Sequence, residues 1–150
     1  MVTSAQPFDI DASMFGETVV RMLRPRHGRR PWPKKQVERW VLLHCAARRI
    51  APGEALAERE VNVRLQDWLL GPADRLAVDF VTIRRALIDE GFWDRDPGGS
   101  RYRLASRHER RVRFAPALPD ESDLLAVGDA ARAARTSPPR TDASGDLPRA

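Results

Sequence analysis

The chain has 150 residues, of which 42% are hydrophobic and 31% charged, and its net charge is +5. This length predicts one domain with a modest core. The single cysteine, Cys45, excludes an internal disulfide and a metal site built from several cysteines. No apolar run reaches the roughly 18 residues that span a bilayer, and the N-terminus lacks the pattern of a secretory signal. We therefore expect a cytoplasmic protein with no membrane partner.

The positive charge is concentrated in two segments of the chain. Residues 21–49 contain ten lysines and arginines against one acid, and residues 101–113 contain six arginines against one acid. Between them, residues 50–100 carry six arginines and ten acids. Basic segments of this kind can bind polyanions such as nucleic acids. An arginine-rich composition can equally serve only to solvate a surface, and the charge pattern leaves both interpretations open.

The first third of the chain predicts a short helix, a basic linker and a longer helix. Residues 1–12 are expected to be unstructured, and residues 13–23 to form a short helix with Ser13 as the N-cap. Three prolines and a glycine in residues 24–35 forbid a regular helix, so this segment is a basic linker. Residues 34–49 repeat apolar side chains every three or four positions, which predicts an amphipathic helix.

The middle of the chain predicts two more helices and a hairpin. Residues 58–70 form the second helix of the domain, and residues 53–57 can supply a short strand before it. Asp79 is a good N-cap for the third helix, and Gly91 is well placed to end that helix in a left-handed conformation. The following residues, 92–104, alternate in polarity around Pro-Gly-Gly and predict two short strands.

The C-terminal part predicts little regular structure. Residues 106–113 are strongly basic, and residues 120–135 form at most a marginal helix with Gly128 in its middle. From Thr136 onward the sequence has no apolar residues for a core and should be disordered.

Three helices followed by a two-stranded hairpin outline a winged helix-turn-helix. We therefore predict an α+β fold in which residues 34–105 form a compact winged-helix-like domain. Residues 1–33 are expected to be a flexible N-terminal arm and residues 106–150 a flexible C-terminal segment.

Three stretches of this domain resemble a known family. "EREVN" (58–62), "VTIRRALIDEGFWDRD" (81–96) and "GGSRYR" (98–103) are similar to the small bacterial domain of unknown function numbered 2087. Members occur alone or attached to helix-turn-helix regulators, and no activity is established for them. The resemblance implies a winged-helix-like fold and a regulatory setting. The chain departs from the family pattern at Ala57, where a capping Ser or Thr is usual, and in the longer segment 69–80, which lacks a histidine.

The adjacent arginines of the third helix predict different roles. On a helical wheel Arg84 falls inside the apolar arc, where an unpaired charge is very costly. We therefore expect an ion pair between Arg84 and Glu58 or Glu60, which lie at the start of the preceding helix. Arg85 lies on the outward side with Thr82, and arginine is the usual partner of guanine in the major groove.

Other basic residues are candidates for contacts with phosphates. The hairpin contributes Arg95, Arg101 and Arg103, and the basic linker contributes Arg29, Arg30, Lys34 and Lys35. Five acids on or beside the third helix argue against base readout, because they repel phosphate. They are Asp79, Asp89, Glu90, Asp94 and Asp96.

No motif of an enzyme or a cofactor site is present, and the histidines lack metal-ligand spacing. His44 is expected to be a partly buried core residue and Cys45 an inert packed thiol. Trp32 could stack on a base or dock on the domain. We predict a non-enzymatic regulatory module that binds nucleic acid, DNA rather than RNA, with weak sequence selectivity. We expect no catalytic, cofactor or metal residues and infer no small-molecule substrate. The alternative is a protein-interaction module, for example one that self-associates.

Overall fold

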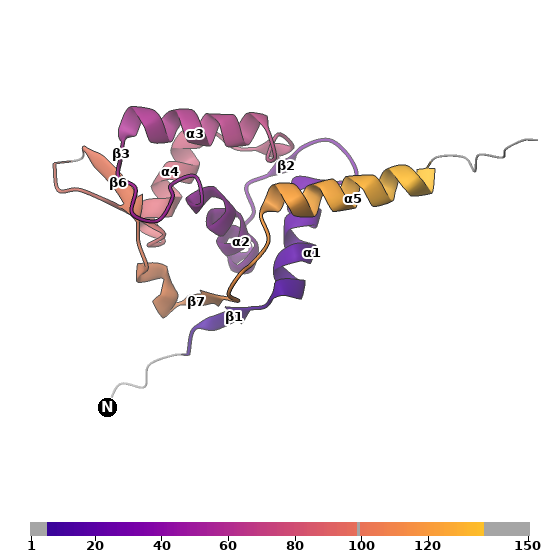
Figure 1. The fold of residues 1–150 in the computed structure, drawn as a ribbon, viewed down its shortest axis with the longest axis horizontal. Coiled ribbons are helices and arrows are strands. Elements are labelled where there is room, and N and C mark those ends of the chain that lie inside the picture. Colours follow the sequence, from indigo (N-terminus) through magenta and orange to yellow (C-terminus); the bar gives the residue numbers. More distant parts are fainter. Residues whose placement is uncertain (1–5, 99, 137–150) are drawn as a thin grey trace, which may run out of the picture.

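The fold is α+β, with five α-helices and several small sheets in the residues that the computed structural model describes, 6–98 and 100–136 (Figure 1). The N-terminal elements are β1 (Phe8–Ile10), α1 (Ala12–Leu23), β2 (Arg30–Pro31) and α2 (Gln36–Ala47). The middle elements are β3 (Leu56–Ala57), α3 (Glu58–Leu70), β4 (Leu76–Ala77), α4 (Phe80–Asp89), β5 (Trp93–Arg95) and β6 (Arg101–Leu104). A short 3-10 helix, η1 (Arg107–Arg110), then leads to β7 (Val112–Phe114) and α5 (Glu121–Thr136).

The predicted hairpin and the predicted short strand form one antiparallel sheet with the strand order β3-β6-β5. Tyr102 of β6 lies opposite Leu56 on one side and Arg95 on the other. Helices α2 and α3 both pack against α4, and α4 leads directly into the sheet. The order of elements expected for residues 34–105 is therefore confirmed.

Both predicted ends of α4 are confirmed. The Asp79 carboxylate accepts a hydrogen bond from the Thr82 backbone N–H at 2.7 Å, which satisfies a donor that the first helical turn leaves free. Gly91 follows the helix with φ +87°, in the left-handed region that favours glycine. A cap is missing from α3, where Ala57 offers no side-chain acceptor.

The Asp79 cap predicts a dependence of stability on pH. Hydrogen bonds from Thr82 lower the pKa of Asp79 below its ordinary value of 3.8. The cap therefore contributes stability above that value and loses it as the pH falls through the lowered pKa. Asp79→Ala should lower the melting temperature by a few degrees at neutral pH. Asp79→Asn, which keeps an acceptor without a titrating group, should lose less stability than the parent chain on acidification. Thermal unfolding followed by circular dichroism checks both variants.

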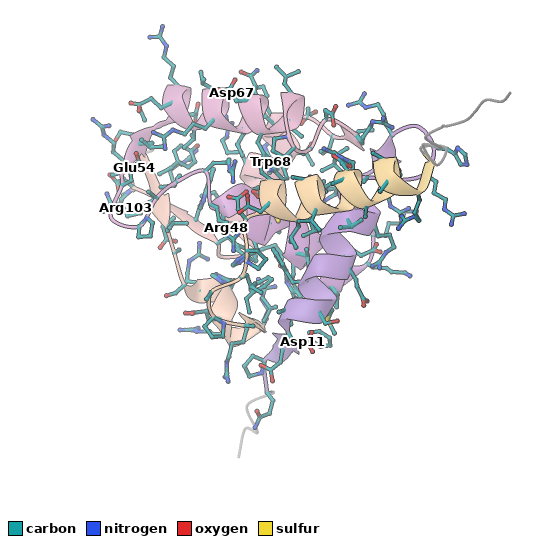
Figure 2. The ribbon with its side chains drawn as sticks, turned by 45° about the vertical axis from the view of Figure 1, so that its right-hand side comes forward. Asp11, Arg48, Glu54, Asp67, Trp68 and Arg103 are labelled. Carbon is teal, nitrogen blue, oxygen red and sulfur yellow. The ribbon has the colours of Figure 1, made fainter. Side chains whose placement is uncertain are left out.

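The N-terminal arm and the segment after β6 are ordered in their described parts, which corrects the prediction of flexible arms. The expected unstructured residues include β1, which pairs in parallel with β7, so that Ile10 lies opposite Phe114. Asp11, not Ser13, caps α1, and its carboxylate accepts from the Met14 N–H at 2.8 Å; Asp11 is labelled at the end of α1 in Figure 2. Both segments fold back because they carry core residues. Those that are buried are Ile10, Phe15, Val19, Met22, Leu23, Val112 and Leu125.

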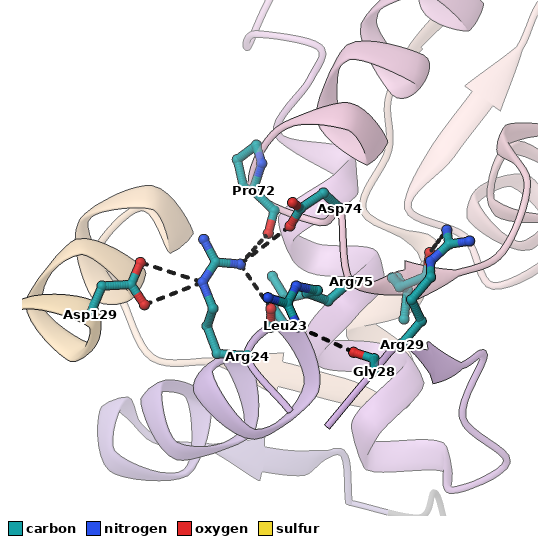
Figure 3. A network of polar contacts seen from close by, with 9 residues as sticks. Leu23, Arg24, Gly28, Arg29, Pro72, Asp74, Arg75 and Asp129 are labelled. Atoms are coloured by element: carbon teal, nitrogen blue, oxygen red, sulfur yellow. Dashed lines mark hydrogen bonds and ion pairs between the residues drawn. The ribbon is translucent and has the colours of Figure 1, made fainter. Parts of the chain in front are cut away.

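The helix predicted as marginal, α5, packs along α1. This packing does not depend on a glycine at position 16, because a Cβ built there would lie 3.7 Å from Leu124 Cδ2, an ordinary contact. Arg24 at the end of α1 joins three parts of the fold. Its Nε donates to Asp129 of α5 at 3.3 Å, and its Nη1 donates to the Pro72 carbonyl at 3.2 Å (Figure 3). The expected disorder of residues 137–150 lies outside the described residues.

Candidate nucleic-acid interface

Helix α4 has a clear division between buried and exposed faces. Ile83 and Leu87 are completely buried against the rest of the fold, whereas Thr82, Arg85 and Asp89 are exposed. The residues predicted to point outward therefore do so. The guanidinium group of Arg85 has no hydrogen bond or ion pair with any residue that the structure describes, and its charge contributes to lowering the pKa of Asp79.

The Arg84 side chain reaches from α4 to the start of α3, but its hydrogen-bond partner there is Asn62 and not the predicted Glu58 or Glu60. The half-buried guanidinium donates from Nη1 to Asn62 Oδ1 at 2.6 Å and is not within ion-pair distance of Glu58 or Glu60 among the described residues. Glu58 instead accepts from the Tyr102 hydroxyl at 2.7 Å. This hydrogen bond, and then the nearby charge of Arg84, lower the pKa of Glu58. Glu60 is exposed. Arg84 therefore connects α4 to α3 through its hydrogen bond to the Asn62 side-chain amide. Its charge also acts on the Glu58 carboxylate from a greater distance.

The three hairpin arginines are all exposed, and they differ in their partners. Arg103 is paired with Asp96 at 2.9 Å, and Arg95 lies 3.4 Å from the Tyr102 hydroxyl. Figure 2 shows Arg103 at the outer edge of the hairpin. Arg101 has no hydrogen bond or ion pair within the described part of the chain. Arg101 is therefore the hairpin arginine with an uncommitted charge.

The basic linker runs beside the segment that leads into α4. Strand β2 pairs in parallel with β4, and the Arg30 backbone N–H donates to the Arg75 carbonyl at 2.7 Å. Arg29 donates from Nη2 to the Leu76 carbonyl at 3.1 Å, and Arg75 donates to the Gly28 carbonyl at 3.4 Å (Figure 3). Arg29 is thus partly engaged in holding the linker in place. The Arg30 side chain is half-buried.

The linker also approaches the other end of α4. Lys34 and Lys35 are exposed immediately before α2, and Gln36 at the start of that helix lies 3.5 Å from Glu90 Oε1 at the end of α4. The linker therefore carries positive charge to both ends of α4. Trp32 is half-buried against the core, which favours the docking interpretation over an exposed stacking platform.

Arginines neutralise most of the acids that argue against binding phosphate here. Arg107 pairs with Asp94 at 2.8 Å, Arg111 pairs with Glu90 at 3.1 Å, and Asp96 is taken by Arg103. The carboxylate of Asp79 is occupied by the helix cap, and Asp89 is left exposed. The sequence could not reveal this neutralisation, because Arg107 and Arg111 approach α4 only through the path of η1.

The histidine and the cysteine of α2 lie in the interior, as predicted. Burial, the charge of Arg48 and that of His108 lower the pKa of His44 to about 3, so its ring is neutral at physiological pH. The ring stacks on Phe114 at 4.1 Å between centroids. Cys45 is buried, and burial raises the pKa of its thiol well above the ordinary value. Over residues 6–98 and 100–136, no three His, Cys, Asp or Glu side chains gather as a metal site. In the same residues no helix is both long and apolar enough to cross a membrane.

One known family matches the chain. The family described as "Uncharacterized protein conserved in bacteria (DUF2087)" matches residues 30–104, which make up half of the chain. The chain belongs to this family. The DUF2087 match begins at β2 and ends at β6, so it contains the three-stranded sheet and the linker beside α4. No curated protein and no solved structure matches the chain.

Proposed function

We propose that the chain is a non-enzymatic regulatory module that binds DNA through a winged-helix unit formed by α2 to β6. Along the chain α3 and α4 lie between β3 and β5, and in the sheet the strand order is β3-β6-β5. This is the arrangement expected of such a unit. In it α4 would enter the major groove, and the hairpin would lie along the phosphate backbone.

One observation carries this proposal. Arg85 on α4 and Arg101 on β6 are exposed and make no hydrogen bond or ion pair with a described residue, while the nearby acids Glu90, Asp94 and Asp96 are paired. An exposed arginine outside any ion pair costs little to move onto an anion, whereas one already in an ion pair must first give that pair up.

Weak sequence selectivity follows from the same surface. Thr82 and Arg85 are the exposed candidates for base contacts, and the Thr82 side chain also donates a hydrogen bond to the Asp79 carboxylate. The remaining positive charge lies in the linker, at Lys34 and Lys35, and on the hairpin. Contacts from these groups would reach phosphates, which carry no sequence information directly.

Titration of labelled duplexes at two salt concentrations tests the proposal. We expect the affinity to fall steeply as the salt concentration rises, because each neutralised phosphate releases counterions. Arg85→Ala should weaken binding by about tenfold or more. Arg101→Ala should weaken it less and should reduce the slope of log affinity against log salt by about 0.9.

Arg113→Ala is the matched control, because Arg113 is an exposed arginine on β7, outside α4, the hairpin and the linker. It should leave binding unchanged. The proposal is wrong if no duplex binds at low salt, or if the control weakens binding as much as Arg85→Ala does. Single-stranded DNA and duplex RNA in the same titration test the preference for duplex DNA.

A further inference from the structure

A groove between α1 and α5 has a volume of about 650 Å³. Its floor is apolar and is formed by Gly16 and Val20 of α1 and by Leu124, Val127 and Gly128 of α5. Val127 is 71% exposed, one of few large apolar side chains left in water in this part of the chain. The groove does not overlap the proposed DNA-binding surface, which lies on α4 and the hairpin.

Beyond its first two turns helix α5 is mostly exposed, although Asp129 pairs with Arg24 at 3.3 Å. Glu121 and Leu125 are buried, but over residues 126–135 every side chain is exposed except Gly128, which is half-buried. Figure 1 shows the end of α5 extending past α1. A 16-residue helix is marginal in water without tertiary packing. A partner along its open side would supply that packing.

The open side of α5 has the spacing of a helix-pairing seam. Leu124, Val127, Ala131 and Ala134 recur at intervals of three, four and three residues, which places them in one row along the helix, and the first two of them line the groove. Three of these four side chains are small or β-branched, so a second helix could approach closely. The seam begins within the groove and continues along the extending half of α5.

The charges of α5 fit a second copy of the same helix. Asp123 lies in its first turn and Arg135 in its last turn, and both are exposed. An antiparallel neighbour of identical sequence would place Asp123 beside Arg135 at both ends, whereas a parallel neighbour would place like charges together. The α1 side of the groove carries Glu17 and Arg21, one charge of each sign.

We propose that this groove is the docking site of a second copy of the chain, with the two α5 helices antiparallel across a twofold axis. Such an interface is isologous, because the same surface is used by both copies. The seam places Val127 of each copy opposite Ala131 of the other.

The full chain should therefore have twice its mass of 16.9 kDa in sedimentation and light scattering at high micromolar concentration. Val127→Asp should raise the dissociation constant of the dimer by at least about tenfold, because it buries a charge in an apolar seam. Leu70→Asp is the matched control, since Leu70 is 81% exposed at the end of α3, away from the groove. It should leave the dimer unchanged. Ala131→Glu provides a second seam variant, and circular dichroism confirms that each variant is folded.

Disulfide cross-linking tests the orientation independently. A mixture of Val127→Cys and Ala131→Cys chains should form mixed dimers faster than either variant cross-links with itself, and the buried Cys45 should not compete. A parent chain that is monomeric throughout, or a dimer that both seam variants leave intact, overturns the proposal. Cross-linking that favours identical chains overturns the antiparallel arrangement. Loss of DNA binding alone would leave these results unaffected.

Discussion

Replacing Gly91 by alanine should lower the free energy of unfolding by about 3 kcal/mol or more. Gly91 has φ +87°, and a Cβ added to it would lie 2.8 Å from the backbone nitrogen of His108 and 2.9 Å from Arg107 Cβ. The His108 N–H donates to the Gly91 carbonyl at 3.1 Å, so the backbone of η1 is held directly against this residue. A methyl group would therefore separate α4 from the segment that carries Arg107.

Gly53→Ala is the control that separates the cost of a left-handed backbone from the cost of the steric contact. Gly53 also has a left-handed backbone, with φ +83°, but an added Cβ would meet no atom within 4 Å. Its substitution should cost only the conformational preference, about 1–2 kcal/mol. Chemical denaturation of both variants measures the difference, which reports the steric contact with η1. Equal losses for the two variants would show that this contact contributes nothing.

The elements that could be predicted are those with strong local signals. Helix α3 begins and ends at the predicted residues, Asp79 and Gly91 bound α4, and residues 53–57 contain β3. Each of these predictions rests on a cap, a turn residue or an apolar repeat that lies within a few residues of the element itself. The pairing of β1 with β7 has no such signal, because two strands of three residues come together across about a hundred residues. For the same reason α5 looked marginal, since its stability comes from packing on α1.

In the candidate interface the exposed and buried faces of α4 could be predicted, but the hydrogen-bond and ion-pair partners of its side chains could not. A helical wheel correctly separated Arg84 from Arg85, because the direction of a side chain follows from its position in the helix. It could not identify the partner of Arg84, because the predicted Glu58 and Glu60 and the observed Asn62 all lie in the first turns of α3. The neutralisation of Glu90 by Arg111 and of Asp94 by Arg107 depends on where η1 lies in space.

Replacing Glu121 by leucine should destabilise the attachment of α5 by about 3 kcal/mol. The Glu121 side chain is fully buried, and Oε1 accepts from Arg49 Nη2 at 2.8 Å. The leucine variant would leave the Arg49 charge without its acid. The expected loss is at the low end for a broken buried pair, because 21% of the Arg49 side chain remains in water. Arg48 donates to the carbonyls of Leu118 and Pro119, and the substitution at Glu121 removes neither donor nor acceptor, so we expect the path of the chain before α5 to be retained.

The double variant Arg49→Met, Glu121→Leu should recover most of that loss, because it removes both charges from the interior. Hydrogen exchange of the α5 amides, compared with those of α2, would show that the effect of the single variant is local. A double variant as unstable as Glu121→Leu alone would mean that the apolar side chain itself does not fit the site.

The contribution of Glu121 to folding stability should change with pH in the opposite direction to that of Asp79. Burial raises the pKa of Glu121 above its ordinary value of 4.5, and the charge of Arg49 opposes this shift without cancelling it. The folded chain therefore binds this proton more tightly than the unfolded chain. The contribution of the carboxyl to stability is fully present below pH 4.5 and is lost as the pH rises through the raised pKa. Glu121→Gln keeps an oxygen for Arg49 without a charge, so it should gain stability relative to the parent chain between pH 4.5 and 7. Denaturant unfolding across that range measures the difference, and a relative loss would show that the ion pair outweighs the cost of burying the carboxylate.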